Sequence, residues 1–263
     1  MKKHTMNYLN KLYSYLLLSL ISILFVNAHP ATIKQDIDWP QFMSQQDMIW
    51  EKLPEYWYDS AFLGNGKLGL MIYKEPGKNY LRLETGNCDV HDHRTKRDVF
   101  GIPRLLTGHF ALHPKGKIIN GTMHLDLWNA EVSTDITTTK GVIHLRSFVH
   151  ADEMMIIVKA TTEGDEHDFQ WEWIAAEANS PRYLIFKRQG KANKIPKDYE
   201  LNPTAKISNE KEVNLSVQKL LAGGETSIGW QETHNPETER TLWINLTPVS
   251  YTHLRAHETK ANL

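Results

Sequence analysis

Short runs in which apolar and polar residues alternate account for most of the chain beyond residue 60. Within Thr122–Trp128, Met123, Leu125 and Leu127 fall on one side of an extended chain. His124, Asp126 and Trp128 fall on the other side. A period of two indicates a strand with one buried face. The same alternation, or a short apolar run, recurs in residues 70–73, 80–83, 130–138, 142–150, 154–162, 169–174, 213–220, 227–230 and 241–247.

These runs are short, and turn residues separate them, while helical periodicity is almost absent. They predict an all-β fold: a large antiparallel two-sheet β-sandwich of the supersandwich type. The sequence holds no repeat of about 20–50 residues, which argues against a solenoid or a propeller. Residues 178–210 lose the pattern and contain three prolines, so we expect long loops there around one short strand, Tyr183–Lys187.

The most informative stretch is Phe62–Arg94, FLGNGKLGLMIYKEPGKNYLRLETGNCDVHDHR. It begins with closely spaced glycines, which indicate a turn with positive φ rather than a nucleotide loop, because a strand and not a helix follows them. Residues 76–79, Pro-Gly-Lys-Asn, predict a hairpin turn between two strands. The second strand then leads into a loop that is dense in ionisable side chains, at one end of the sheet, where β scaffolds usually carry function.

This stretch resembles the N-terminal β-sandwich domain of glycoside hydrolase family 95, the α-L-fucosidase-type enzymes. Trp50 and Trp57 upstream and Leu125–Val132 downstream fit the resemblance, which covers about Trp50 to Glu166. The sequence departs from the family in the loop, where ETGNCDVHDHR replaces an Asn-Glu-Asp-Thr-Leu-Trp type of run. The departure concerns the sugar that is bound more than the fold.

The resemblance implies a non-catalytic N-terminal domain fragment of an exported glycoside hydrolase acting on a glycan, with an α-L-fucoside as one candidate. Glycoside hydrolysis usually uses two facing carboxylates, and Glu84, Asp89 and Asp92 lie close together in the sequence. In the family, however, these carboxylates come from a later (α/α)6 barrel. We therefore assign no catalytic residue and no cofactor, and we expect that barrel to be the partner of the sandwich.

The polar loop and one exposed tryptophan are the candidate glycan-binding residues: Asn87, Asp89, His91, Asp92, His93, Arg94 and Trp128. A cluster of this kind is costly to bury unpaired, so we expect Arg94 to bridge Asp89 or Asp92 and to fix the shape of the loop. On this view an Arg94→Ala variant would lose substrate binding and hardly change the melting temperature. Trp128 could instead pack on the second sheet or on another domain.

A metal site is the competing interpretation of the loop. Extended backbone would place Asp89, His91 and His93 on one side, with His109 and His113 as further donors, but the spacing matches no closed zinc pattern. We therefore predict no metal. The single cysteine, Cys88, excludes an internal disulfide and is interpreted as an inert thiol.

The amino terminus predicts export. Lysines precede an apolar run, Tyr15–Val26, that is shorter than the ~20 residues of a membrane span, and Val26-Asn27-Ala28 offers a cleavage site. We expect a helical signal segment at 1–28, a periplasmic or extracellular protein, and no membrane association after cleavage. An uncleaved anchor is the alternative.

The remaining boundaries follow from composition. Residues 29–49 are polar and are expected to form an irregular linker, and residues 50–248 the sandwich. Residues 249–263 lose the strand pattern and resemble translated sequencing adapter, so they are expected to be a non-native tail, with an ordinary polar tail as the alternative. A net charge of −1 gives nucleic-acid binding no electrostatic support. A stand-alone carbohydrate-binding or structural β-sandwich module is the alternative to the enzyme fragment.

Overall fold

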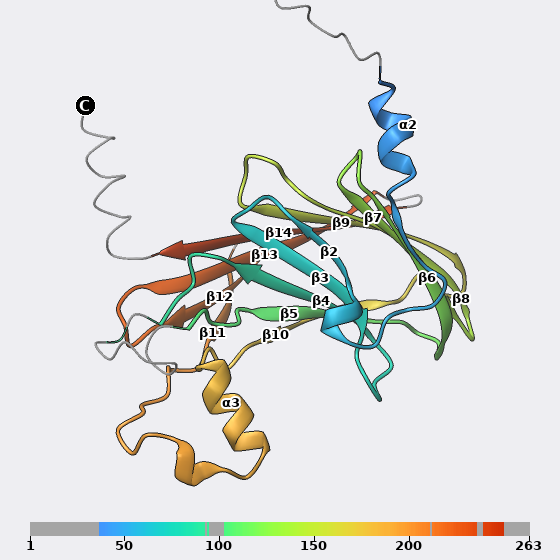
Figure 1. The fold of residues 1–263 in the computed structure, drawn as a ribbon. Coiled ribbons are helices and arrows are strands. Elements are labelled where there is room, and N and C mark those ends of the chain that lie inside the picture. The colour runs from blue at the N-terminus through green and yellow to red at the C-terminus, as the bar shows by residue number, and fades with distance from the viewer. Residues whose placement is uncertain (1–36, 93, 95–102, 211, 236–238, 250–263) are drawn as a thin grey trace, which may run out of the picture. The chain divides into compact units, whose positions relative to one another are not determined.

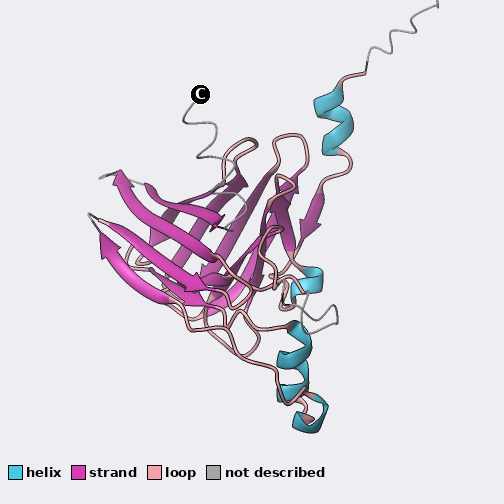
Figure 2. Ribbon diagram, turned by 90° about the vertical axis from the view of Figure 1, so that its left-hand side faces the viewer, coloured by secondary structure: helices cyan, strands magenta, loops and turns pink. Residues whose placement is uncertain are grey.

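The computed structural model describes residues 37–249, except 93, 95–102, 211 and 236–238. The predicted signal segment and nearly all of the predicted tail lie outside these residues. The described strands form two sheets (Figures 1 and 2). In spatial order, the nine-stranded sheet contains β1 (Met48–Trp50), β6 (Ile118–Asp126), β7 (Glu131–Thr138), β8 (Gly141–Val149), β9 (Met155–Gly164), β14 (Glu239–Val249), β13 (Glu225–Asn235), β12 (Val213–Lys219) and β11 (Lys206–Glu210). The five-stranded sheet contains β10 (Gln170–Ala175), β5 (Gly108–His113), β4 (Leu81–Asn87), β3 (Leu68–Lys74) and β2 (Ala61–Gly64).

Every strand pairing in the two sheets is antiparallel. The predicted all-β, two-sheet sandwich is therefore confirmed. The helices are short and lie outside the two layers (Figure 2). They are α2 (Trp39–Ser44), η1 (Trp57–Asp59), α3 (Pro181–Arg188) and η2 (Ala192–Lys194). Within the described part of the chain, no helix has the length and apolar character that a membrane span requires.

The core lies between the sheets and is built by the alternating residues of both. On β6, Met123 and Leu125 are buried while His124 between them is exposed, as the sequence pattern predicts. Aromatic rings join the layers: the Phe110 ring on β5 lies 4.8 Å from that of Trp173 on β10 and 5.6 Å from that of Trp230 on β13, centroid to centroid. Burial of apolar surface stabilises the fold by about 25 cal/mol per Å². Ring pairs of this kind stabilise it further.

The glycine turn and the predicted hairpin form three neighbouring strands, β2 to β4, of the five-stranded sheet. Gly66 adopts φ +88°, a conformation that favours glycine, whereas Gly64 and Gly69 face each other within the paired strands. Asn65 anchors this turn, because its side-chain Nδ2 donates to the carbonyls of His150 and Glu153 in the β8–β9 connection at 2.9 and 3.2 Å. One turn is thereby tied to both sheets.

Three expectations need correction. Strand β4 continues to Asn87, so Glu84 and Asn87 belong to the sheet and not to the loop, because hydrogen bonds within the sheet accommodate their polar groups. Residues 183–187 are helical within α3, which buries none of its residues and begins with proline at its first position. The segment 29–49 is not irregular throughout: it contains α2, and β1 begins at Met48 and pairs with β6.

A fully buried carboxylate, Glu166, stands where the chain passes between the sheets. Its Oε2 accepts from the backbone N–H of Lys115 at 2.9 Å and its Oε1 from that of Gly116 at 2.8 Å, while the Thr138 hydroxyl also donates to Oε1. Lys115 and Gly116 connect β5 to β6, and Glu166 itself connects β9 to β10. A single side chain therefore joins two of the crossovers between the layers, β5–β6 and β9–β10.

We expect Glu166→Ala to destabilise the sandwich by about 2–4 kcal/mol, because the backbone N–H groups of Lys115 and Gly116 and the Thr138 hydroxyl would lose their acceptor. Urea unfolding followed by tryptophan fluorescence measures the change. Glu163→Gln is the matched control, since this carboxylate lies on the exposed end of β9, where substitutions usually change stability by less than about 0.5 kcal/mol. Equal stability of the two variants would contradict the role given to Glu166.

Candidate functional site

The polar loop after β4 alternates between buried and outward-facing residues. Val90 and Asp92 are buried, whereas Asp89 is exposed and His91 is half-buried. The backbone of His91 forms an isolated antiparallel β-bridge with that of Arg104. Asn87 is buried at the end of β4, and its Oδ1 accepts from the backbone N–H of Asp89 at 2.8 Å. His93 lies outside the described residues. Extended alternation of the loop is thus observed over the part that the structure describes.

Arg94 forms an ion pair with Asp92, one of the two partners that the sequence predicted. Its Nε donates to Asp92 Oδ1 at 2.8 Å, and the Asp92 side chain is completely buried. The guanidinium also donates from Nη1 to the carbonyl of Glu200 and lies 4.9 Å above the centroid of the Tyr199 ring. The hydroxyl of Tyr199 accepts from the backbone N–H of Ser180 at 2.8 Å. Arg94 therefore fastens the loop to the segment around α3.

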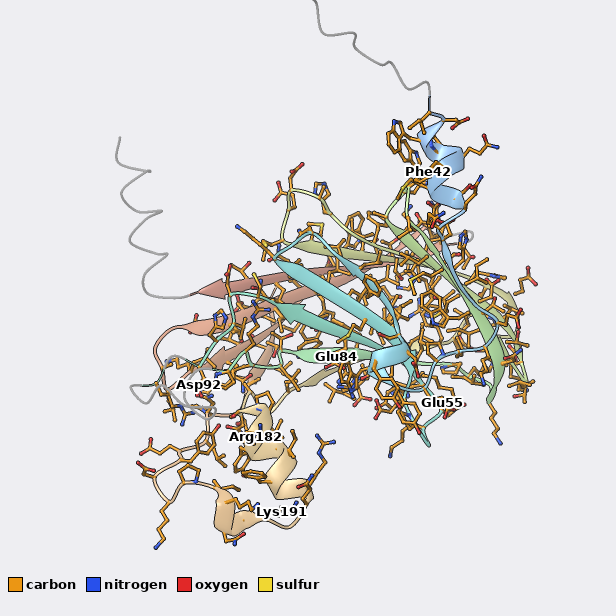
Figure 3. All side chains as sticks on the ribbon, in the orientation of Figure 1. Phe42, Glu55, Glu84, Asp92, Arg182 and Lys191 are labelled. Carbon is orange, nitrogen blue, oxygen red and sulfur yellow. The ribbon has the colours of Figure 1, made fainter. Side chains whose placement is uncertain are left out.

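A small apolar cluster, separate from the main core, supports this contact. Val90, Leu105 and Ala178 are buried together there, and Leu220 packs against them. Figure 3 shows Asp92 near the end of the sandwich that α3 flanks, whereas Glu84 lies further along the five-stranded sheet. Asp92 and Arg94 consequently set the shape of the loop, and Asp89 and His91 are its outward-facing described members.

Trp128 is 51% exposed and lies just past the end of β6, in the turn before β7. That turn is fixed by Asp126, whose carboxylate accepts from the side-chain and backbone N–H groups of Asn129 at 2.7 and 2.9 Å. These hydrogen bonds lower the pKa of Asp126. Trp128 lies in a turn between two strands of the nine-stranded sheet, so it is not part of the hydrogen-bonded arrangement built around Arg94.

The structure does not gather those proposed metal ligands that it describes, Asp89, His91, His109 and His113. Among the residues it describes, no group of three or more His, Cys, Asp or Glu side chains is arranged to hold a metal ion. His109 and His113 lie on β5, apart from the loop. Cys88 is half-buried, and burial, together with the neighbouring Asp89 charge, raises the pKa of its thiol. A raised thiol pKa disfavours the reactive thiolate.

The outer face of the five-stranded sheet carries a polar network centred on Glu84. Tyr73 and Arg82 both bind Glu84 Oε2, at 2.7 Å from the tyrosine hydroxyl and 3.1 Å from the guanidinium Nε. Arg82 also donates from Nη1 to Glu75 at 3.0 Å. Burial, reinforced by Glu84, raises the pKa of the Tyr73 phenol, so the phenol remains a donor. Two adjacent side chains, Tyr73 and Arg82, thus hold the Glu84 carboxylate rigidly.

His109 lies opposite Glu84 on the neighbouring strand and is 7% exposed. Burial, with a smaller contribution from the positive charge of Arg82, lowers the pKa of His109 to about 4. Its Nε2 has no hydrogen-bond partner among the described residues. At neutral pH the imidazole is therefore uncharged, and it carries a buried polar atom that nothing described satisfies.

A groove of about 420 Å³ opens beside this network, at the end of the sheet from which the loop emerges. Gly69 and Gly86 face each other across β3 and β4, and a Cβ added at Gly86 would meet no atom within 4 Å. Met71 and Arg104 also line the groove, and Glu84 is the one acidic residue among the described lining residues. The described lining therefore does not contain the two facing carboxylates of glycoside hydrolysis.

Sequence reasoning overlooked Tyr73 and Arg82 as members of this network and considered His109 only as a metal ligand. Their common position follows from strand register, since Tyr73 pairs with Arg82 and Glu84 pairs with His109. Alternation within β4 could have indicated that Arg82 and Glu84 share a face. It could not have indicated which residues of β3 and β5 lie beside them.

Comparisons with known proteins identify no family. No family model and no curated protein matches the sequence. Among solved structures, the chain is similar to "Putative kojibiose phosphorylase from human microbiome", with a TM-score of 0.41 and 12% sequence identity over 71% of this chain. The match covers 26% of that structure, so this chain spans about a quarter of its length.

We expect Arg94→Ala to lower the stability of the sandwich by about 2–4 kcal/mol, because the buried Asp92 carboxylate would lose its charged donor. This replaces the expectation of an almost unchanged melting temperature. Trypsin should also cleave the segment around α3 sooner. Arg182→Ala removes an arginine stacked on Phe186 within α3 and should change stability by less than about 0.5 kcal/mol. An Arg94 variant as stable as the Arg182 variant would contradict the structural role given to the Arg94–Asp92 ion pair.

The lowered pKa of His109 predicts an acid-dependent loss of stability. Between the ordinary histidine pKa of 6.5 and about 4, the unfolded chain binds a proton that the folded chain does not. Above pH 6.5 the histidine therefore does not lower the free energy of unfolding. As the pH drops from 6.5 toward 4, the free energy of unfolding falls. In His109→Gln this loss should be smaller by about 1–2 kcal/mol.

Urea unfolding at pH 7, 6, 5 and 4.5 measures this slope. His167→Gln is the control, because its side chain is 63% exposed. If wild type and His109→Gln lose stability in parallel while the pH falls, His109 is not the group responsible.

Proposed function

We propose that the chain is the non-catalytic N-terminal β-sandwich domain of an exported glycoside hydrolase that acts on a glycan, with an α-L-fucoside as the candidate substrate. The observation that carries the proposal is the outer face of the five-stranded sheet. There, a carboxylate held by Tyr73 and Arg82 borders a groove that is open above Gly86. Rigid acceptors and donors beside an open groove suit the hydroxyl groups of a sugar.

The resemblance of Phe62–Arg94 to family 95 enzymes adds support, since this stretch forms β2 to β4 and the loop beside the groove. The catalytic carboxylates would come from an (α/α)6 barrel that follows the sandwich. Within the loop, Asp92 and Arg94 hold the shape, and Asp89 and His91 are the described side chains proposed to contact substrate. Asn87, His93 and Trp128 remain proposed contributors.

The decisive experiment extends the gene beyond residue 249 and assays the product with aryl α-L-fucosides, galactosides and glucosides. We expect an extended chain with a helical domain to hydrolyse at least one of them and the 263-residue chain to hydrolyse none. A stop codon soon after residue 249 would contradict the proposal. Turnover by the 263-residue chain that Glu84→Gln abolishes would also contradict it, because catalysis would then reside in the sandwich.

In the extended enzyme we expect Gly86→Leu to lower kcat/KM roughly tenfold or more while leaving stability within about 1 kcal/mol of wild type, because the added side chain enters open space. Thr122→Leu is the matched control: it adds an apolar side chain at an exposed outer-face position of β6, away from the groove. An unchanged kcat/KM in Gly86→Leu would remove the groove from the substrate path.

A stand-alone carbohydrate-binding module is the second candidate. The observation that favours it is a set of exposed aromatic residues close to η1, with Trp57 and Tyr58 each 63% exposed. A binding module would need no barrel. The same gene extension separates the two candidates, because only the enzyme requires a further catalytic domain.

A further inference from the structure

A second and larger groove lies at the other end of the five-stranded sheet. It has a volume of about 1600 Å³ and is formed mainly by residues 48–60, with parts of β2, β3 and β6. Figure 3 shows Glu55, one of its lining residues, well separated from Asp92 of the polar loop. No described residue of the polar loop lines this groove. We call it the aromatic groove.

Three consecutive aromatic residues give the groove its character. Tyr56, Trp57 and Tyr58 are 49%, 63% and 63% exposed, and Phe62 beside them is 55% exposed. The rings of Tyr56 and Tyr58 are stacked, with centroids 5.2 Å apart and planes within 4°, and the Trp57 ring meets that of Tyr58 edge to face. These rings therefore present apolar faces and edges to solvent in a fixed arrangement.

Hydrogen bonds hold the segment that carries these rings. The Ser60 hydroxyl donates to the carbonyl of Trp57 at 2.7 Å, and the Trp50 indole donates to the carbonyl of Asp59 at 2.8 Å. The backbone N–H of Lys74 donates to the carbonyl of Pro54 at 2.8 Å, which anchors the segment to β3. The rings are thus ordered before any ligand arrives, which lowers the entropic cost of binding.

The charged side chains that line the aromatic groove indicate which class of ligand it can bind. Three carboxylates and two amines line the groove, and Lys74 is paired with Glu55 at 3.0 Å. A rim so nearly balanced offers no cationic surface to sulfated, phosphorylated or nucleic-acid ligands. It does offer hydrogen-bond donors and acceptors next to aromatic faces, which is the combination that a neutral pyranose, with its apolar and hydroxylated surfaces, requires.

The size and the extent of the groove indicate an oligomeric ligand. Its volume exceeds the ~300–1,000 Å³ usual for small-molecule sites. Phe62 and Met71 line both this groove and the smaller one above Gly86, so the two adjoin across the outer face of the sheet. A chain of several sugar units could therefore lie along η1 and continue toward Gly86.

We propose that the aromatic groove binds a neutral oligosaccharide or polysaccharide chain, with Trp57 and Tyr58 stacking on its pyranose rings. This binding needs no catalytic domain and does not depend on the chain being part of an enzyme. It would hold the sandwich on a glycan irrespective of the bond that is cleaved.

Affinity electrophoresis of the full chain in native gels tests the proposal, with xyloglucan, laminarin or galactomannan as neutral probes and dextran sulfate as the anionic probe. We expect at least one neutral polysaccharide to retard the wild type and dextran sulfate not to do so. Trp57→Ala and Tyr58→Ser should each weaken the binding constant roughly tenfold. Trp39→Ala is the matched control, since this tryptophan is 51% exposed on α2, outside the groove, and should bind as the wild type does.

Thermal melting establishes that each variant is folded, and the two groove variants serve as independent tests. The proposal is overturned if none of the three neutral probes retards the wild type, or if folded Trp57→Ala and Tyr58→Ser migrate as the wild type does. Retardation by dextran sulfate alone would also overturn it. Sedimentation that reveals a dimer dissolved by Trp57→Ala would assign the groove to a second copy of the chain instead. Glycosidase activity is not measured, so this result and that of the gene extension are independent.

Discussion

The hydrogen bonds of the buried Glu166 carboxylate are the interaction on which the arrangement of the two sheets depends. The chain leaves the five-stranded sheet after β5 and returns to it before β10, and both crossovers meet at this side chain. The contact also requires glycine at position 116, because a Cβ there would lie 2.7 Å from Glu166 Oε1. With the crossovers fixed, the outer face of the five-stranded sheet is free to carry polar side chains that contribute nothing to the core.

The sandwich was predictable because burial on one face leaves a period of two in the sequence. Met123 and Leu125 on β6 illustrate this, as do Phe169 and Trp173 around β10, all of which are buried. The helix α3 was missed for the converse reason: it buries no residue, so its sequence shows no helical periodicity. Proline directly after Ser180 was the available signal, since both residue types are typical of a helix start.

The candidate site was predictable only as far as local geometry reaches. The pairing of Arg94 with Asp92, two residues away, follows from extended backbone and opposite charges. The contact of Arg94 with Glu200 spans 106 residues and depends on how the α3 segment folds back, which no local pattern specifies. The same holds for His109, whose low pKa arises from burial and from Arg82 on a neighbouring strand.

At the facing glycines of β3 and β4, Gly69 and Gly86, the shape of the surface can change without a change in the stability of the fold. Gly86 lies in regular strand conformation, and the space above it is empty, so the depression there exists because side chains are missing. Substitution at such a position alters the contour of the surface without disturbing the core. A single substitution at this point can therefore reshape the groove while the residues that form the core stay unchanged.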